Sequence, residues 1–373
     1  MECRVLAALF LLACLCVTPA SGEQQNRPNR GPRKSGYRLA TKPMPESEAR
    51  IGWFKDAKLG MFIHWGIYST RGGIAPNGEP MKGAYTEWYQ KRVGLNNKAY
   101  SKLAAEFNPK HFNADTWATI AKNAGMKYII ITAKHHDGFC IFDSDFTAFD
   151  IADATPFQRD PLMELREACD KHGLKLIYYY SHAQDWEQYH AWQTDKWIFP
   201  DMAGTPVDHE KYLTTKALPQ VRELLTKYRA DGIWFDTPRF AEEEIVPIST
   251  RFSELVRKTN PKALINSRIT HISRDRALQG HLFDYISLGD QKVPRGKLPM
   301  YAEVPDSIHH SYGYDKRPNV HYKTAAELLP RVIQTVARNA NSVINVGPTG
   351  LGEIPEQAQA NLAEIGDWMK THG

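Results

Sequence analysis

The sequence predicts an α/β protein built as a (β/α)₈-like, TIM-type barrel. After residue 51, eight short apolar runs rich in β-forming residues alternate with amphipathic segments that carry helix start and stop signals. The apolar runs are nearly continuous, which is typical of strands buried on both faces of a parallel sheet. An open doubly wound sheet is the alternative, but no glycine-rich phosphate-binding sequence follows the first run.

Each predicted strand is an apolar run that is short enough for one pass through a barrel. The eight strands cover Leu59–His64, Tyr128–Lys134, Leu174–Ser181, Gly232–Asp236, Ala263–Asn266, Tyr285–Leu288, Met300–Glu303 and Ser342–Val346.

The segments between the strands carry residues that typically begin and end helices. Asp160 and Pro161 open one helix with an N-cap and a proline in the first turn, and Gly173 closes it. Pro219 lies inside an apolar pattern and is expected to start or kink a helix. The gaps after the fifth and sixth strands are too short or too irregular for clear helices, so we expect a degenerate barrel there. The other predicted helices are Thr116–Asn123, Pro219–Arg229, Glu243–Lys258, Ala325–Asn339 and Gln357–Thr371.

The first 43 residues differ from the rest of the chain. Residues 1–22 resemble a secretory signal peptide, with Arg4 before the apolar run Val5–Val17. Residues 23–43 are expected to be a basic disordered linker, and residues 44–373 are the predicted barrel domain. The protein is therefore expected to be secreted or periplasmic, or to reach a lysosomal-type compartment in a eukaryote. Because Leu11-Leu12-Ala13-Cys14 resembles a bacterial lipobox, a lipid anchor at Cys14 is the alternative to cleavage.

Charge and cysteine usage exclude several classes of protein. The chain carries a net charge of +5, and the linker alone supplies it, with six basic residues against Glu23. The barrel domain is therefore neutral overall and gives no reason to expect nucleic acid as a partner. Outside the signal, no apolar run is long enough for a membrane span. Beyond the signal only Cys140 and Cys169 remain, without the spacing of a metal site or a disulfide framework.

Polar and aromatic residues gather where the predicted strands end. In barrel enzymes the chemistry lies at the carboxyl ends of the strands, so these positions are the candidate site. Asp236 is the clearest case, because this carboxylate terminates a wholly apolar strand. The other strand ends carry His64, Lys134-His135-His136-Asp137, the run Tyr178 to His182 that includes Tyr180, Asn266-Ser267-Arg268 and Glu303.

These residue types suit glycoside cleavage. A pair of carboxylates can act as nucleophile and acid/base at about 5–5.5 Å, or can activate a water at about 6.5–9.5 Å. Histidine and tyrosine exchange hydrogen bonds with sugar hydroxyls, and aromatic rings pack against the C–H face of a sugar. A metal site at His135, His136 and Asp137 is disfavoured, because adjacent side chains on a strand point to opposite faces.

With these residues in place, the chain resembles the α-L-fucosidases of glycoside hydrolase family 29, from about Trp53 to Gly373. No single motif is specific, but their order and spacing together are. The matching segments are Lys58-Leu-Gly-Met-Phe-Ile-His-Trp-Gly66, Glu87-Trp88-Tyr89, Ala133-Lys-His-His-Asp-Gly-Phe139, Tyr178-Tyr-Tyr-Ser181, Gly232-Ile-Trp-Phe-Asp236 and Asn345-Val-Gly-Pro348.

The resemblance implies a retaining exo-acting enzyme that removes terminal α-linked L-fucose from a fucosylated oligosaccharide or glycoconjugate through a covalent intermediate. It places Asp236 at the family's nucleophile and Glu303 at its acid/base, although Tyr301-Ala-Glu-Val304 departs from the family's Trp-Glu-Thr segment. Arg268 falls on an arginine near the nucleophile. No metal or organic cofactor is implied, and no room remains for the family's usual C-terminal β-sandwich. The implied ligands of the fucose hydroxyls are His64, Glu87, Trp88, His135, His136 and Tyr180.

Three alternatives remain open at this point. A roomier pocket would accept L-galactose, which differs from L-fucose only by a hydroxyl at C6, and apolar pockets reject such additions weakly. A barrel whose acid/base has decayed would bind fucose without cleaving it. Metal-dependent hydrolysis is the third alternative. The sequence leaves the linkage, the natural glycan and the oligomeric state open.

Overall fold

The computed structural model describes residues 45–192, 195–241, 243–271, 281–298 and 300–373. The predicted signal peptide, the basic linker and Cys14 lie outside the described residues. Within the described ranges, no helix combines the length and the apolar composition that crossing a bilayer requires.

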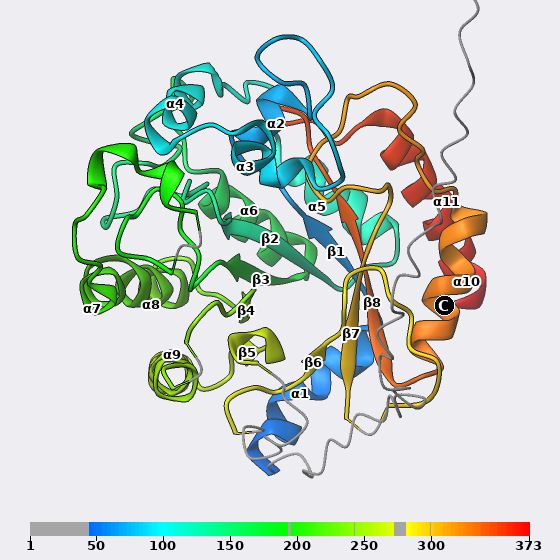
Figure 1. Cartoon of the computed structure of the whole chain (residues 1–373). Helices are drawn as coiled ribbons and strands as arrows, with labels where there is room; N and C mark the ends of the chain where they lie inside the picture. Colours follow the sequence, from blue (N-terminus) through cyan, green and yellow to red (C-terminus); the bar gives the residue numbers. More distant parts are fainter. Residues whose placement is uncertain (1–44, 193–194, 242, 272–280, 299) are drawn as a thin grey trace, which may run out of the picture. The chain divides into compact units, whose positions relative to one another are not determined.

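Eight parallel strands form one curled sheet, as predicted for a (β/α)₈-like fold (Figure 1). The strand order is β5-β4-β3-β2-β1-β8-β7-β6, so each pair of adjacent strands is consecutive in sequence except for β1 and β8. The strands are β1 (Leu59–Ile63), β2 (Tyr128–Lys134), β3 (Lys175–Tyr180), β4 (Gly232–Phe235), β5 (Leu264–Ile265), β6 (Ile286–Ser287), β7 (Ala302–Ser307) and β8 (Ala340–Val346).

The sheet is weakest between β5 and β6, where the sequence predicted a degenerate barrel. Both strands have only two residues, and a single bridge between Asn266 and Tyr285 joins the two edges. In the described residues between β5 and β7, the only helical segment is the 3₁₀ turn Ser267–Ile269. Among the described residues of this seam, no α-helix packs outside the two short strands.

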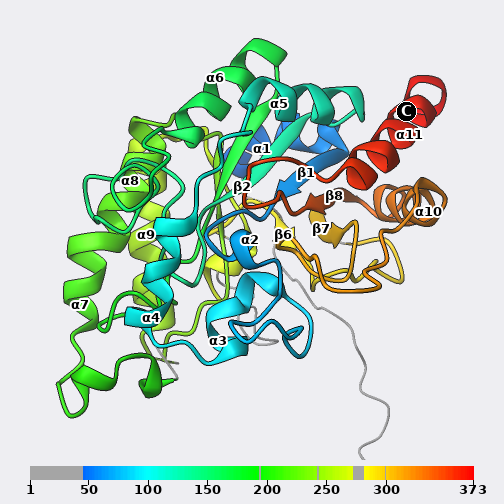
Figure 2. The ribbon, with the colours of Figure 1, turned by 90° about the horizontal axis from the view of Figure 1, so that it is seen from above.

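Helices cover the outer face of the sheet, and the segment before β1 forms a helix of its own, α1 (Figures 1 and 2). Asp160 caps α6 by accepting a hydrogen bond from Met163, and Gly173 ends it with a φ of 71°. The segment around Pro219 changes from a π turn, Leu213–Ala217, to α8, as expected for a proline that starts a new helix. The helices are α1 (Pro45–Ala57), α2 (Tyr68–Arg71), α3 (Tyr89–Val93), α4 (Asn97–Ser101), α5 (Ala114–Asn123), α6 (Pro161–His172), α7 (His209–Tyr212), α8 (Leu218–Thr226), α9 (Ile245–Thr259), α10 (Ala325–Val336) and α11 (Glu356–His372).

Strand side chains divide into two buried layers. Phe62, Tyr179 and Trp234 belong to a cluster inside the barrel, whereas Tyr178 and Tyr180 belong to the layer between sheet and helices. Helix α1 packs against the inner cluster through Ile51 and Phe54. The carbonyl of Phe54 accepts a 2.7 Å hydrogen bond from Asn341 on β8. The inner cluster therefore forms a solid floor beneath the carboxyl ends of the strands.

Strand β7 differs from its prediction in a way that affects the site. The prediction ended this strand at Glu303, but the strand runs from Ala302 to Ser307, so Glu303 is its second residue. The apolar pattern stops early because Asp306 and Ser307 are polar. Both are nonetheless buried, since Asp306 is paired with Lys323 and Arg331.

Candidate active site

A cavity of about 230 Å³ opens at the carboxyl ends of the strands. It brings together seven of the nine predicted site residues, and Tyr180 and Glu303 are not among the residues that line it. The lining residues are Phe62, His64, Tyr85, Glu87, Trp88, Arg92, His135, His136, Tyr179, Trp234, Asp236, Thr237, Arg268, Asp290, Pro305 and Tyr312.

Asp236 follows β4 and is held by its neighbours on both sides. Asn266 pairs with the peptide of Phe235 in both directions, at 2.9 Å to the N–H and 2.9 Å from the carbonyl. Thr237 takes a φ of 44°, the left-handed region that a β-branched residue rarely adopts. A strained residue of this kind persists only where the surrounding structure fixes it. The local backbone therefore turns sharply after Asp236 and leaves its carboxylate in the cavity.

The carboxylate of Asp236 receives two strong hydrogen bonds. Tyr179 donates its hydroxyl to Oδ2 at 2.9 Å, and Arg268 donates Nη1 to Oδ1 at 2.9 Å. Burial alone would raise the pKa of Asp236, but the charge of Arg268 and these two donors outweigh burial and hold the pKa below its usual value. Asp236 is therefore ionised near neutral pH.

The same guanidinium also holds a second carboxylate of the cavity, Asp290. Arg268 donates Nη2 to Asp290 Oδ1 at 2.6 Å, so one side chain bridges Asp236 and Asp290. Arg268 is itself fixed, because it donates to Ser287 Oγ and to the Leu288 carbonyl, and it stacks over Trp234. Asp290 is 39% exposed, which leaves it reachable by a ligand.

Asp290 was missed by the sequence analysis. The signal was present, because Gly289-Asp290 directly follows the sixth predicted strand. The rule that identified Asp236 at the end of the fourth strand also applies to this position.

Two histidines of the cavity are neutral and present an acceptor nitrogen. Burial lowers the pKa of His64 to about 3 and the pKa of His136 well below its usual value. The amide nitrogen of Asn345 donates to the Tyr312 carbonyl, so the amide oxygen of Asn345 faces His64. His64 Nδ1 must therefore donate to Asn345 Oδ1, at 2.7 Å. Each ring thus keeps Nε2 free of a proton and able to accept a hydrogen bond from a hydroxyl.

The same reasoning fixes the tautomer of His136. Ser181 donates its hydroxyl to the Gln184 carbonyl at 2.7 Å, so Ser181 Oγ accepts from His136 Nδ1 at 2.6 Å. His136 Nε2 then lies 3.6 Å from Asp236 Oδ2. Two acceptors this close favour a ligand hydroxyl that donates between them.

Aromatic rings complete the wall beside these groups. His135 stacks on Tyr179 with ring centroids 5.2 Å apart, and Trp88 meets His136 edge to face at 5.1 Å. Burial lowers the pKa of His135 well below its usual value, so this ring is also neutral. Together the rings give the cavity one apolar side, which suits the C–H face of a sugar.

Glu87 is a third acid of the cavity, and its role differs. Its Oε2 accepts from the N–H groups of Tyr312 and Gly313 and from the hydroxyl of Ser311, at 2.8–3.3 Å. Burial nevertheless raises the pKa of Glu87 to about 7. With Oε2 fully engaged, Oε1 is the atom that a ligand can reach.

Comparison with known proteins decides the family. The profile described as alpha-L-fucosidase matches residues 29–373. The chain belongs to the α-L-fucosidase family. It is 28% identical to rat plasma α-L-fucosidase over 90% of this chain and 71% of the rat protein, and 27% identical to the Dictyostelium discoideum enzyme over 89% and 71%. The protein is thus a glycoside hydrolase with α-L-fucosidase activity.

Solved structures agree with this family. AlfC from Lactobacillus casei superposes with a TM-score of 0.76 at 33% identity, over 86% of this chain and 98% of AlfC. The Vibrio sp. EJY3 α-L-fucosidase gives 0.78 at 32% identity, over 90% of this chain and 57% of the Vibrio chain. AlfC has been solved with α-L-fucose and with Fucα(1,6)GlcNAc.

In this α-L-fucosidase Tyr179 lines the cavity. The prediction that Tyr180 lies in the site was wrong. Tyr180 points to the opposite face of β3, where its hydroxyl donates to Gln220 at 2.8 Å and Lys134 lies over its ring. Tyr179 instead donates to Asp236. Strand alternation separates the two residues.

Glu303 lies beneath the catalytic pocket of the fucosidase, contrary to its predicted position at the end of a strand. Ser307 pairs with Asn345 at the level of Phe62, and Glu303 is four residues earlier, roughly 13 Å along the strand. Its carboxylate accepts from Trp234 Nε1 at 2.7 Å and from the Tyr128 hydroxyl at 3.3 Å. Glu303 is 0% exposed and supports the Trp234 indole from below.

The described part of the chain contains no group of three His, Cys, Asp or Glu side chains placed to hold a metal ion. Among the residues that the structure describes, Cys140 and Cys169 are buried and do not pair with each other. The functional groups of the cavity are therefore carboxylates, neutral imidazoles, the guanidinium groups of Arg92 and Arg268, and aromatic rings.

Proposed function

We propose that this protein is a retaining exo-α-L-fucosidase in which Asp236 is the nucleophile and Asp290 is the acid/base. One observation carries the proposal: Arg268 bridges these two carboxylates at the mouth of the barrel. Retaining glycosidases use two carboxyl groups about 5–5.5 Å apart. One guanidinium that donates to both carboxylates holds Asp236 and Asp290 close to each other. Glu303, which the family resemblance implied as the acid/base, is buried below the floor.

In the first step, Asp236 Oδ attacks the anomeric carbon of a terminal fucose. The bond between this carbon and the glycosidic oxygen breaks while protonated Asp290 transfers its proton to the departing oxygen. The products are an ester between fucose and Asp236 and a leaving group that carries the proton. The lowered pKa of Asp236 keeps the nucleophile ionised before the attack.

In the second step, the Asp290 carboxylate takes a proton from a water whose oxygen attacks the same carbon. The ester bond to Asp236 breaks, and the fucose leaves with its original configuration after two inversions. Formation of the ester removes the charge of Asp236, so Asp290 is then the one charged carboxylate of the pair on Arg268.

The size and lining of the cavity favour a single terminal sugar. A volume of about 230 Å³ lies below the range of roughly 300–1,000 Å³ that larger ligands occupy. Neutral His64, His135 and His136 suit uncharged hydroxyls. The AlfC complexes with α-L-fucose and Fucα(1,6)GlcNAc support a fucosylated oligosaccharide as the substrate class.

Two variants and one stereochemical measurement test this mechanism. Asp236→Ala should abolish turnover of 4-nitrophenyl α-L-fucoside, and azide should partly restore it with formation of β-L-fucosyl azide. Asp290→Ala should lose about 10²–10⁴-fold in kcat/KM on substrates with poor leaving groups, and azide should give the α-azide. NMR should detect α-L-fucose as the first released anomer. Release of β-L-fucose, or full activity of Asp236→Ala, would overturn the proposal.

The rates on matched aryl α-L-fucosides and α-L-galactosides decide which of the two sugars the pocket prefers. Saturable binding of fucose without turnover of any aryl fucoside would instead support a non-catalytic barrel.

We also propose that the protein is exported through residues 1–22. Expression with the native N-terminus should yield a mature protein that begins near residue 23, as read by intact mass. A protein that retains Met1 in the cytoplasm, or one with a lipid mass on Cys14, would contradict a cleaved soluble form.

A further inference from the structure

The residue after Asp290 is held unusually tightly. Gln291 has a φ of 55°, so the chain reverses there in the left-handed region. Its N–H donates to the Pro305 carbonyl at 2.8 Å, and its own carbonyl accepts from Arg331 Nη2 at 2.8 Å. Its side-chain oxygen accepts from Lys323 Nζ at 3.0 Å. Such a conformation costs of order 1–3 kcal/mol and needs these contacts to persist.

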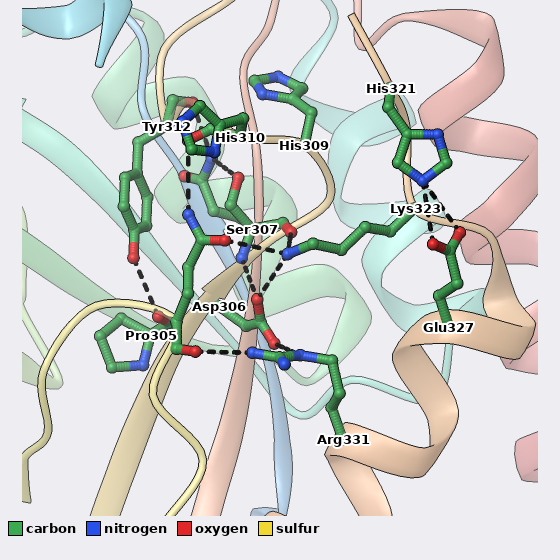
Figure 3. A network of polar contacts seen from close by, with 12 residues as sticks. Pro305, Asp306, Ser307, His309, His310, Tyr312, His321, Lys323, Glu327 and Arg331 are labelled. Atoms are coloured by element: carbon green, nitrogen blue, oxygen red, sulfur yellow. Dashed lines mark hydrogen bonds and ion pairs between the residues drawn. The ribbon is translucent and has the colours of Figure 1, made fainter. Parts of the chain in front are cut away.

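Lys323 and Arg331 meet on one buried carboxylate, Asp306 of β7 (Figure 3). Lys323 Nζ lies 3.0 Å from Asp306 Oδ1 and also donates to the Ser307 carbonyl at 2.7 Å. Arg331 reaches the other oxygen of Asp306 from helix α10. Asp306 is 2% exposed, so it needs a cation to offset the cost of burying its charge. The ion pairs with Asp306 therefore fix both cations independently of their contacts with Gln291.

Asp290 and this cluster lie on two sides of the same short segment. Asp290 faces the cavity and Arg268, while Gln291 faces Lys323 and Arg331. Strand β6, which precedes the segment, has only two residues, and no helix of the described residues follows it before β7. Side chains from beyond β7 thus supply the support that a regular barrel unit would supply.

We propose that Lys323 and Arg331 are positioning residues that hold the acid/base Asp290 in place through Gln291. The inference rests on the proposed role of Asp290. Lys323 fixes the side chain of Gln291 and Arg331 fixes its backbone, so loss of either lets the carboxylate of Asp290 move. A displacement of about 1 Å at a catalytic group can cost about 100-fold in rate.

The test uses Lys323→Met and Arg331→Met, measured separately. Each variant leaves Asp306 paired with the remaining cation, so neither creates an unpaired buried charge. The readout is kcat/KM for 4-methoxyphenyl α-L-fucoside, whose leaving group needs a proton, and for the 2,4-dinitrophenyl fucoside, whose leaving group does not. We expect a loss of about 10–100-fold on the first substrate and of less than about threefold on the second.

The chain offers a matched control at the opposite end of the barrel. Asp284 is likewise buried, and it likewise pairs with two cations, Arg50 and Arg257. Arg257→Met therefore makes the same chemical change away from the cavity. It should lower the thermal midpoint by a similar amount while leaving the ratio between the two substrates unchanged.

A double variant tests the route through Gln291. Gln291→Ala should reproduce the effect of Lys323→Met, and Lys323→Met should then cost nothing further in the Gln291→Ala background. If Lys323→Met and Arg331→Met lose kcat/KM equally on both substrates, the inference is overturned. It is also overturned if Arg257→Met changes the ratio between the two substrates as much as these variants do. The reference is Asp290→Ala: if this variant loses both substrates equally and shows no azide product, the acid/base assignment itself fails.

Discussion

Replacing Glu303 with glutamine should stabilise the protein at alkaline pH and leave the leaving-group dependence of the enzyme unchanged. Burial raises the pKa of Glu303 from 4.5 to about 7, even though Trp234 and Tyr128 donate hydrogen bonds to it. The folded protein therefore holds a proton on Glu303 that the unfolded chain releases near pH 4–5.

The sign of the pH dependence follows from this difference. Between about pH 4.5 and about pH 7 the folded state binds one more proton at Glu303 than the unfolded state. The contribution of this group to stability is thus complete below about pH 4.5 and is lost as the pH rises through about 7. The interval between the two pKa values corresponds to about 3 kcal/mol, at about 1.4 kcal/mol per pH unit.

Glutamine at position 303 has no such titration and still offers an oxygen to Trp234 Nε1. We therefore expect urea unfolding to show that the free energy of unfolding of the variant, relative to that of the wild type, is about 3 kcal/mol higher at about pH 8 than at about pH 4.5. A difference that is the same at both pH values would refute the reasoning. A loss of about 10²-fold or more in kcat/KM confined to poor leaving groups would instead return Glu303 to the role of acid/base.

Three further outcomes are expected. Tyr179→Phe should lower kcat/KM roughly 10–100-fold and raise the pKa of the acid limb of the pH–rate profile, because it removes a hydrogen-bond donor to charged Asp236. Tyr180→Phe should leave both kcat/KM and this pKa unchanged. Asn345→Leu should raise KM more than it lowers kcat, because it removes the acceptor that fixes the tautomer of His64; an unchanged KM would contradict that role. Dialysis against a chelator should leave kcat unchanged, and a loss restored by added metal would contradict the carboxylate mechanism.

The barrel could be predicted because its signal is local. Continuous apolar runs such as Tyr128–Lys134 and Gly232–Phe235 form buried strands wherever they are placed, and the structure gives these strands nearly the predicted bounds. The carboxyl ends of such strands meet at one edge, so residues such as Asp236 and His135 were predicted to lie together, and they do.

The misplaced residues have a common cause, which is that their positions depend on contacts remote in sequence. Tyr179 and Tyr180 are equally suited to a strand buried on both faces, and only the register decides which of them faces the cavity. The end of β7 was missed because Asp306 is polar, and its burial becomes intelligible only with Lys323 and Arg331 in view. No local pattern contains that information.

The two carboxylates of the proposed mechanism are supported in different ways. Asp236 follows a strand with neighbours on both sides, and Asn266 fixes the peptide before it, so the sheet itself positions the nucleophile. Asp290 follows a two-residue strand at the open seam, where the sheet provides little. An acid/base at the seam therefore depends on ion pairs from outside the sheet. If this reasoning holds, variants at the seam should weaken proton transfer to the leaving group before they weaken attack by the nucleophile.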